Sequence, residues 1–157
     1  MSSSEKMRIL LDSTYLLPIV GVDVKGIDRT IVILKRLRDE GIAEYYYTLF
    51  NILEILGKLS GVRYDIDRVT IGLLSIEEEF KQVNPTLKGW LKALELRSKG
   101  HKDLIDLLLY TTSLMHNILF LTRDDRLIRF LENNGEDISI IIHEKELLSR
   151  YGRSTPL

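Results

Sequence analysis

Residues 118–125 read Ile-Leu-Phe-Leu-Thr-Arg-Asp-Asp, an apolar run that ends in a pair of carboxylates. A short, continuously apolar run of this kind is typical of a strand that is buried on both faces, as in parallel sheets. Two like charges beside a buried strand repel each other, so helix capping, proton uptake or a bound cation must offset the repulsion. The stretch therefore predicts a parallel sheet with a polar site at its carboxyl edge.

Apolar runs and helical spacings alternate along the rest of the chain. Strands are predicted at residues 7–11, 43–47, 118–122 and 138–142. Helices are predicted after Ser13 with a break at Pro18, and at 26–41 with Asp28 as N-cap, 48–59, 86–100, 102–117, 125–135 and 144–151. Residues 62–85 fit a helix, a loop and a short strand near 80–83 in several registers. This alternation predicts an α/β fold, a three-layer α/β/α sandwich around a central, mostly parallel sheet.

Length and composition restrict the class of protein. The 157 residues fit a single domain, 1–157, with its core at about 7–146 and a frayed tail at 152–157. A hydrophobic content of 45% excludes a disordered chain, and a net charge of −1 means that any polyanion must bind to a local basic patch. The absence of cysteine excludes disulfides and Cys-ligated zinc. Because no signal peptide or membrane span is visible, we expect a cytoplasmic protein without membrane contact.

Four acids lie at the ends of predicted elements. Asp12 and Asp124 follow strands, Glu54 lies early in the helix at 48–59, and Asp106 lies near the start of the helix at 102–117. Ligands of parallel α/β sheets bind beyond the carboxyl ends of the strands, so these acids can converge there. Two carboxylates about 4 Å apart repel by about 4 kcal/mol at an effective dielectric near 20. An all-oxygen cluster therefore predicts Mg²⁺ or Mn²⁺, which suits phosphodiester hydrolysis.

Each acid also has an ordinary structural explanation. Either Asp124 or Asp125 can cap the following helix, and Asp12 can cap a turn. Asp103 and Asp106 lie where the helix dipole favours acids. Glu54 is flanked by apolar residues, but a single acid can lie on the solvent side of a helix. Taken singly, no acid identifies a site.

The order and spacing of the motifs together resemble the PIN domain, the metal-dependent nuclease fold of VapC-type toxins and related ribonucleases. RILLDSTYLLPIVG (8–21) looks like the opening strand of the family with its Asp, and YTLFNILEILGKL (47–59) is similar to the segment that carries its Glu. The stretch from Asp106 to Asp124 resembles the block of Asp, helix, strand and T-x-D, which is the most specific piece. The resemblance covers residues 7 to about 146.

The resemblance implies an endoribonuclease that uses Mg²⁺ or Mn²⁺ to hydrolyse RNA phosphodiester bonds and leaves a 5′-phosphate and a 3′-hydroxyl. It implies a catalytic, metal-binding cluster of Asp12, Glu54, Asp106 and Asp124, supported by Ser13, Thr122 and Asp103. Asp125 receives no role. If the protein is a toxin, the resemblance implies an antitoxin protein as partner and a homodimer.

Two other functions remain open. A PIN-fold module that binds RNA or protein without cutting would have the same pattern. A haloacid-dehalogenase-like phosphatase would use Asp12 as its nucleophile, but it would require a second Asp where Thr14 stands. Basic side chains that could hold RNA occur in two clusters, Lys35, Arg36 and Arg38, and Arg97, Lys99, His101 and Lys102. Solvated helix ends explain these clusters equally well.

Overall fold

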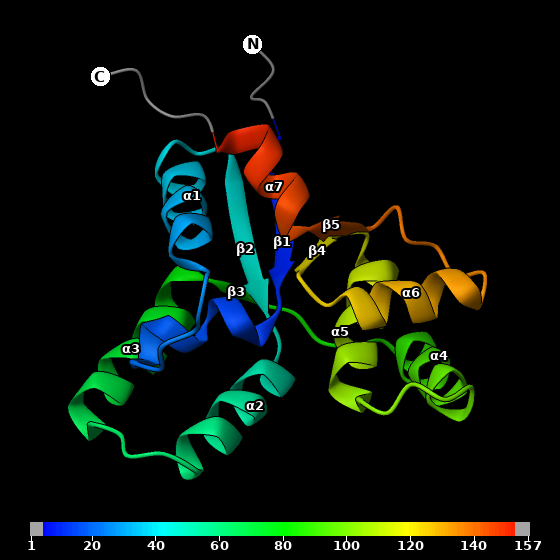
Figure 1. Cartoon of the computed structure of the whole chain (residues 1–157), viewed down its shortest axis with the longest axis horizontal. Helices are drawn as coiled ribbons and strands as arrows, with labels where there is room; N and C mark the ends of the chain where they lie inside the picture. The colour runs from blue at the N-terminus through cyan, green and yellow to red at the C-terminus, as the bar shows by residue number, and fades with distance from the viewer. Residues whose placement is uncertain (1–4, 153–157) are drawn as a thin grey trace.

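The computed structural model describes residues 5–152, so the predicted frayed tail lies outside the described part from residue 153 onward. Its centre is a sheet of five strands in the order β3-β2-β1-β4-β5 (Figure 1). The strands are β1 (Met7–Leu11), β2 (Ala43–Tyr47), β3 (Lys81–Gln82), β4 (Leu119–Thr122) and β5 (Ile141–His143). Every pairing between neighbouring strands is parallel, which confirms the predicted sheet.

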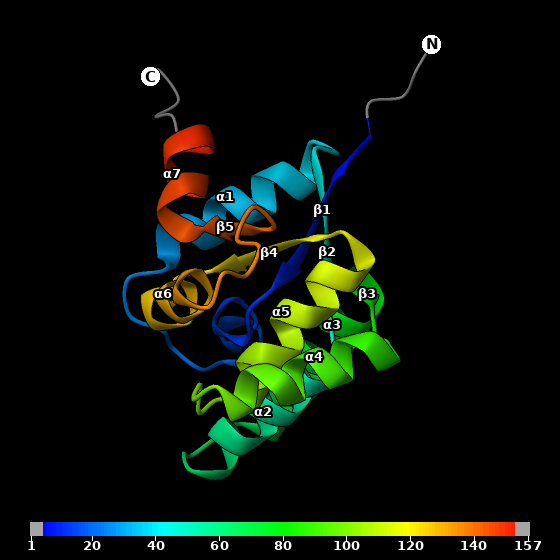
Figure 2. The same cartoon turned by 90° about the vertical axis from the view of Figure 1, so that its right-hand side faces the viewer.

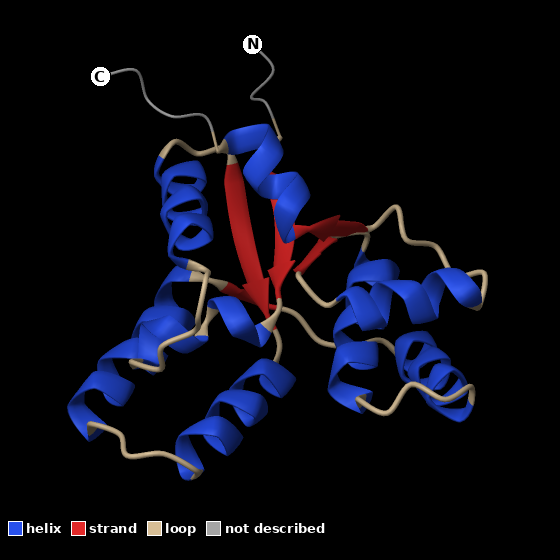
Figure 3. Ribbon diagram, viewed as in Figure 1, coloured by secondary structure: helices blue, strands red, loops and turns tan. Residues whose placement is uncertain are grey.

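Helices cover both faces of the sheet, as the ribbon in Figure 3 shows. They are α1 (Asp28–Asp39), α2 (Leu49–Ser60), α3 (Ile66–Glu79), α4 (Leu87–Ser98), α5 (Leu104–His116), α6 (Asp125–Asn133) and α7 (Glu144–Tyr151). The three-layer α/β/α architecture is therefore confirmed. None of the helices within residues 5–152 combines the length and the apolar character that a membrane crossing requires.

Successive side chains of the central strands enter two different cores. Leu10 and Phe120 pack with α4, α5 and α6, whereas Ile9, Leu11 and Leu121 pack with α1, α2, α3 and α7. A strand with apolar neighbours on both faces needs apolar side chains at every position, since adjacent side chains point in opposite directions. This arrangement explains the unbroken apolar runs in the sequence.

Strand β1 lies in the middle of the sheet. The next strands of the chain, β2 and β3, lie on one side of it, and the later strands β4 and β5 lie on the other. Loops that leave two neighbouring strands in opposite directions open a crevice beyond the carboxyl ends of those strands. Asp12 follows β1 directly, and its N–H donates to the carbonyl of Leu121 at 3.2 Å. The segments with the predicted acids therefore begin side by side.

Three local predictions were wrong. The segment after Ser13 forms two short 3₁₀ helices, η1 (Ser13–Tyr15) and η2 (Leu17–Val20), and the interruption falls at Leu16 and not at Pro18. Pro18 lies in the first turn of η2, where its missing N–H costs no helical hydrogen bond. Asp28 is the first residue of α1 and makes no cap bond; Ile27 is at the N-cap position. The last strand begins at Ile141 and not at residue 138, since Asp137 accepts hydrogen bonds from the N–H and hydroxyl of Ser139 and stabilises a turn.

Helix α4 was predicted from the spacing of apolar residues that face the solvent. Its buried positions are Gly89, Ala93 and Leu96, which lie against α5 (Figure 2). The leucines at 87, 91 and 94 and the neighbouring Trp90 are all more than half exposed. The helix itself is confirmed, but its apolar stripe is on the face that the domain core does not cover.

Gly72 allows α3 to pack directly on η2, the turn that follows the Asp12 segment. A Cβ at this position would clash with the backbone carbonyl of Ile19 and lie 2.9 Å from the Cα of Val20. Because backbone cannot move aside as a flexible side chain can, Gly72→Ala should lower the free energy of unfolding by about 1–3 kcal/mol. Urea unfolding monitored by circular dichroism measures this change.

The matched control is Gly57→Ala in α2, where no atom lies within 4 Å of an added Cβ. There the better helix propensity of alanine should raise the free energy of unfolding by about 0.5–1 kcal/mol. Equal effects of the two substitutions would contradict the close approach of α3 and η2.

Candidate functional site

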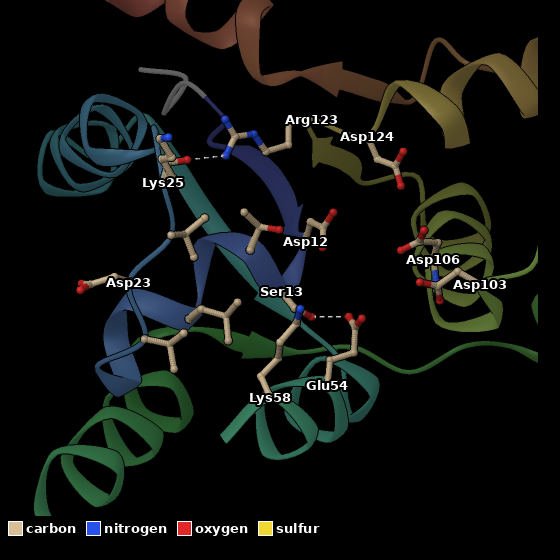
Figure 4. A pocket seen from close by; sticks show the side chains of 14 residues that line it. Asp12, Ser13, Asp23, Lys25, Glu54, Lys58, Asp103, Asp106, Arg123 and Asp124 are labelled. Atoms are coloured by element: carbon tan, nitrogen blue, oxygen red, sulfur yellow. Dashed lines mark hydrogen bonds between the residues drawn. The ribbon is translucent and has the colours of Figure 1, made fainter. Parts of the chain in front are cut away.

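A cavity of about 460 Å³ lies beyond the carboxyl ends of β1 and β4. Acidic side chains from five separate segments line it (Figure 4), and so does Ser13. The acids are Asp12, Asp23, Glu54, Asp103, Asp106 and Asp124. The fold thus brings all four acids of the predicted cluster to one place. Thr122 does not line the cavity, but its buried hydroxyl is hydrogen-bonded to the carboxylate of Asp12 and to the backbone N–H of Asp124.

Thr122 connects the ends of β1 and β4. Its side chain is fully buried, and its hydroxyl donates to Oδ2 of Asp12 at 3.1 Å. The same oxygen accepts the N–H of Asp124 at 3.1 Å. A hydroxyl can donate one bond and accept others, so a single threonine fixes both segments. This contact gives the T-x-D spacing a physical reason.

Asp124 is both a helix cap and part of the cavity wall. Its Oδ1 accepts the N–H groups of Arg126 and Leu127 at 3.0 and 3.2 Å, which makes it the N-cap of α6. Both cap bonds use Oδ1, so capping does not occupy Oδ2. The two explanations suggested by the sequence are therefore compatible for this residue.

Glu54 is held by the segment that follows β1. The hydroxyl of Ser13 donates to its Oε1 at 2.6 Å. Asn51, which is fully buried, donates through Nδ2 to the Ser13 hydroxyl and to the carbonyl of Leu11, both at 3.0 Å. Its Oδ1 accepts the N–H of Thr48 at 2.7 Å and completes a capping box. The prediction missed Asn51, although the Thr48-x-x-Asn51 spacing before an apolar run was a usable signal.

The start of α5 contributes Asp103 and Asp106. Asp103 is the N-cap, because its Oδ1 accepts the N–H groups of Ile105 and Asp106 at 3.0 and 3.2 Å. Asp106 lies one turn further on, with its side chain 13% exposed, and its Oδ2 is 3.5 Å from Nε2 of His101. His101 was predicted only as part of a basic cluster that could hold RNA, and not as a neighbour of the acids.

The positions of the acids raise three pKa values. Burial and the nearby charge of Glu54 raise the pKa of Asp12 to about 6, against the opposing hydrogen bond from Thr122. Burial raises the pKa of Asp106 to about 8, with further contributions from the charges of Asp103 and Asp12. Burial also raises the pKa of Glu54, while the hydrogen bond from Ser13 lowers it. The cluster therefore resists full ionisation near neutral pH unless positive charge is added.

The donor set of the cavity fits a hard divalent cation. All candidate ligands are oxygens, which Mg²⁺ and Mn²⁺ prefer. Within the described part of the chain, no three acidic or histidine side chains are gathered into a ready-made metal cage. Mg²⁺ commonly takes only one or two carboxylates and completes its coordination with water. Two acids such as Asp106 and Asp124, which both line the cavity, are sufficient for that mode.

Cationic side chains on the cavity wall were not predicted from the sequence. Lys25, Lys58 and Arg123 line the cavity. Arg123 is held in place, because it lies 3.1 Å from Oε2 of the buried Glu144 and donates to the carbonyl of Lys25 at 3.2 Å. Lys58 lies one turn after Glu54 on α2, and Arg123 directly precedes Asp124, so the sequence held a usable signal for both. Lys25 lies on a segment without a predicted acid and left no such signal.

Asp125, to which the sequence assigned no role, lies outside the wall of the cavity. Its Oδ1 is 3.0 Å from Nε2 of His143. Nδ1 of the same ring accepts the N–H of Lys145, which assigns the ring proton of a neutral His143 to Nε2. Asp125 thus links the start of α6 to the start of α7.

Comparison with solved structures places the fold among toxin–antitoxin proteins. A chain of VapBC2 from Rickettsia felis, solved bound to a DNA fragment from the promoter, gives a TM-score of 0.62 at 15% identity over 87% of this chain and 97% of that chain. VapBC-1 from nontypeable Haemophilus influenzae gives 0.60 at 14% identity over 88% and 99%. A toxin-antitoxin complex from Klebsiella pneumoniae gives 0.58 at 12% identity over 87% and 97%. The fold is therefore close to that of VapC toxins.

Sequence comparison identifies the family. None of the curated protein sequences is significantly similar to this chain. Residues 9–132, however, match the family described as PIN domain. The match begins in β1, ends in α6 and includes every acid of the cavity. The chain therefore belongs to the PIN domain family.

Proposed function

We propose that this protein is a Mg²⁺- or Mn²⁺-dependent endoribonuclease that hydrolyses RNA phosphodiester bonds and leaves a 5′-phosphate and a 3′-hydroxyl. The observation that carries the proposal is the shared cavity of Asp12, Glu54, Asp106 and Asp124, which come from four separate segments. Membership of the PIN domain family, whose members are typically nucleases, supports it.

The four acids would hold the cation, which when bound supplies positive charge beside the phosphate and makes a water molecule more acidic. Thr122 keeps the Asp12 carboxylate oriented, and Ser13 does the same for Glu54. With a pKa of about 6 in the metal-free protein, the Asp12 carboxylate is largely ionised at neutral pH and so available to the cation. Lys58, on the same wall, would offset the charge of the phosphate.

The solved relatives extend the proposal to partners. Those from R. felis and H. influenzae are VapBC proteins, and the one from K. pneumoniae is a toxin-antitoxin complex. By analogy, this protein would be the toxin of a VapBC-type pair, with an antitoxin protein as its partner. A short reading frame for a DNA-binding protein directly upstream of its gene would support this assignment.

The proposed homodimer has a candidate surface on α4. Leu87, Trp90, Leu91 and Leu94 follow the i, i+3, i+4, i+7 spacing and are all 54–66% exposed. Such a stripe forms one apolar face of a helix, and exposed apolar patches mark interaction surfaces. The same face of a second copy can cover it around a two-fold axis.

The two alternative functions differ in what they require. A phosphatase with Asp12 as nucleophile would require an acid where Thr14 lines the cavity, and membership of the PIN domain family argues against it. A non-catalytic module would bind RNA without Mn²⁺ binding at the acids. Titration calorimetry with Mn²⁺ distinguishes it from the nuclease.

Substitution of single cavity acids tests the nuclease directly. Asp12→Asn and Asp124→Asn should each reduce cleavage of end-labelled RNA in Mn²⁺ by at least about 100-fold, because each removes a charged oxygen ligand. Asparagine is as good an N-cap as aspartate, so Asp124→Asn should preserve α6. Asp125→Asn, the same change one residue away and outside the cavity, should retain most of the activity. Equal losses of cleavage activity in Asp124→Asn and Asp125→Asn would contradict the assignment of Asp124 to the catalytic cluster.

The pH dependence of stability tests the electrostatics. In the metal-free protein the pKa of Asp106 is raised to about 8, whereas in the unfolded chain it is near 4. Asp106 therefore loses its proton at a lower pH in the unfolded chain than in the folded protein. As a result, the free energy of unfolding should fall as the pH rises from about 4 to about 8 and should stay constant above about 8. Asp106→Asn should make the fall shallower in urea unfolding experiments.

Added Mn²⁺ should raise the stability of the wild type at pH 8, since it binds only to the folded acids, and should raise that of Asp106→Asn much less. A wild-type protein whose stability is unchanged by Mn²⁺ would count against a metal at this cavity.

Substitution on α4 tests the dimer. Leu91→Glu should shift the molar mass measured by light scattering from dimer to monomer, because a carboxylate would be buried between two apolar faces. Ile71→Glu on α3, at a residue of similar exposure, should leave the dimer intact. Dissociation by Ile71→Glu alone would place the interface elsewhere.

A further inference from the structure

A second cavity, of about 450 Å³, borders the acidic cluster. It is lined by the turn between α4 and α5, the start of α5 and one face of α6: Gly100, His101, Lys102, Asp103, Asp106, Asp124, Arg126 and Phe130. Asp103, Asp106 and Asp124 also line the first cavity. The two cavities therefore meet at the acids, and a ligand that extends through both would pass directly over them.

The second cavity carries two exposed cations, Lys102 and Arg126. Neither has an ion-pair partner within 4 Å among residues 5–152. Arg123 in the first cavity, by contrast, is paired with Glu144. Cations without an ion-pair partner of this kind are suited to bind the phosphates of a nucleic acid.

An aromatic pair forms part of the same wall. The rings of His101 and Phe130 have their centroids 5.1 Å apart, with an angle of 39° between the planes. Nε2 of His101 lies 3.5 Å from Oδ2 of Asp106. The imidazole ring therefore lies between Phe130 and the acids. Both residues are only partly buried. Aromatic side chains beside a basic groove are typical of sites where unpaired bases stack.

We propose that the second cavity binds the nucleotide next to the scissile phosphate in single-stranded RNA. Lys102 and Arg126 contact its phosphate, and its base stacks on Phe130. This inference rests on the proposed nuclease function and names the part of the substrate that the cavity holds. Because a base within a duplex cannot stack on a protein side chain, the cavity selects unpaired RNA.

The experiment measures RNA binding without cleavage. The parent protein is the full chain with Asp12→Asn, a residue that lines only the first cavity. Fluorescence anisotropy of a labelled single-stranded RNA gives its affinity at several salt concentrations. The double substitution Lys102→Ala and Arg126→Ala should weaken binding by about tenfold or more. The slope of log K against log salt should become shallower by about 0.7 for each phosphate that the protein no longer neutralises.

A charge-matched control is the double substitution Lys88→Ala and Arg129→Ala. Both residues are exposed, and neither lines either cavity. This control should bind like the parent. Phe130→Leu should weaken binding of single-stranded RNA by about fivefold or more with little change in salt slope, because it removes stacking and not charge.

The outcomes separate this inference from the nuclease proposal. If the Lys102 and Arg126 variant binds RNA with the affinity and salt slope of its control while the wild type cleaves RNA, the second cavity is not a subsite and the nuclease proposal stands. If the wild type neither binds nor cleaves RNA, the nuclease proposal fails and the subsite with it. Both substituted cations are exposed, so loss of folding does not obscure the result.

Discussion

The buried hydroxyl of Thr122 joins the ends of the two central strands, because it donates to the Asp12 carboxylate and accepts the N–H of Asp124. Asn51 makes the equivalent connection on the other side of β1, where it links the carbonyl of Leu11 to the hydroxyl of Ser13. Buried polar groups are tolerated only when they are hydrogen-bonded, and both of these are. The sheet brings the acids to one edge, and these two side chains fix their positions.

The central sheet could be predicted because burial on both faces demands continuous apolar runs, as at β1 and β4. The errors lie where local contacts compete with propensity. The turn at Asp137 delays the last strand, and the segment after Ser13 is interrupted at Leu16, with Pro18 inside the second 3₁₀ helix. Sequence patterns describe which face a helix could bury, but only tertiary packing decides whether it is buried. The exposed leucines of α4 show this difference.

The candidate site could be predicted in part for the same reason. Acids that follow parallel strands must reach one edge of the sheet, so Asp12 and Asp124 could be located from the sequence alone. His101 could not, because its approach to Asp106 is set by the turn before α5, which leaves no periodic pattern. Lys58 could have been, since it lies one turn after Glu54 on α2. The position of Asp124 also shows that a residue can cap a helix with one carboxylate oxygen and still present the other to a ligand.

Trp90 is the only tryptophan of the chain, and it lies on the exposed face of α4. Its indole ring meets water in the isolated folded protein as it would in the unfolded chain. Intrinsic fluorescence should therefore report unfolding of the monomer poorly, whereas Trp90 would be covered in the proposed dimer. A shift of the emission to shorter wavelength would instead indicate that another molecule has covered this helix face.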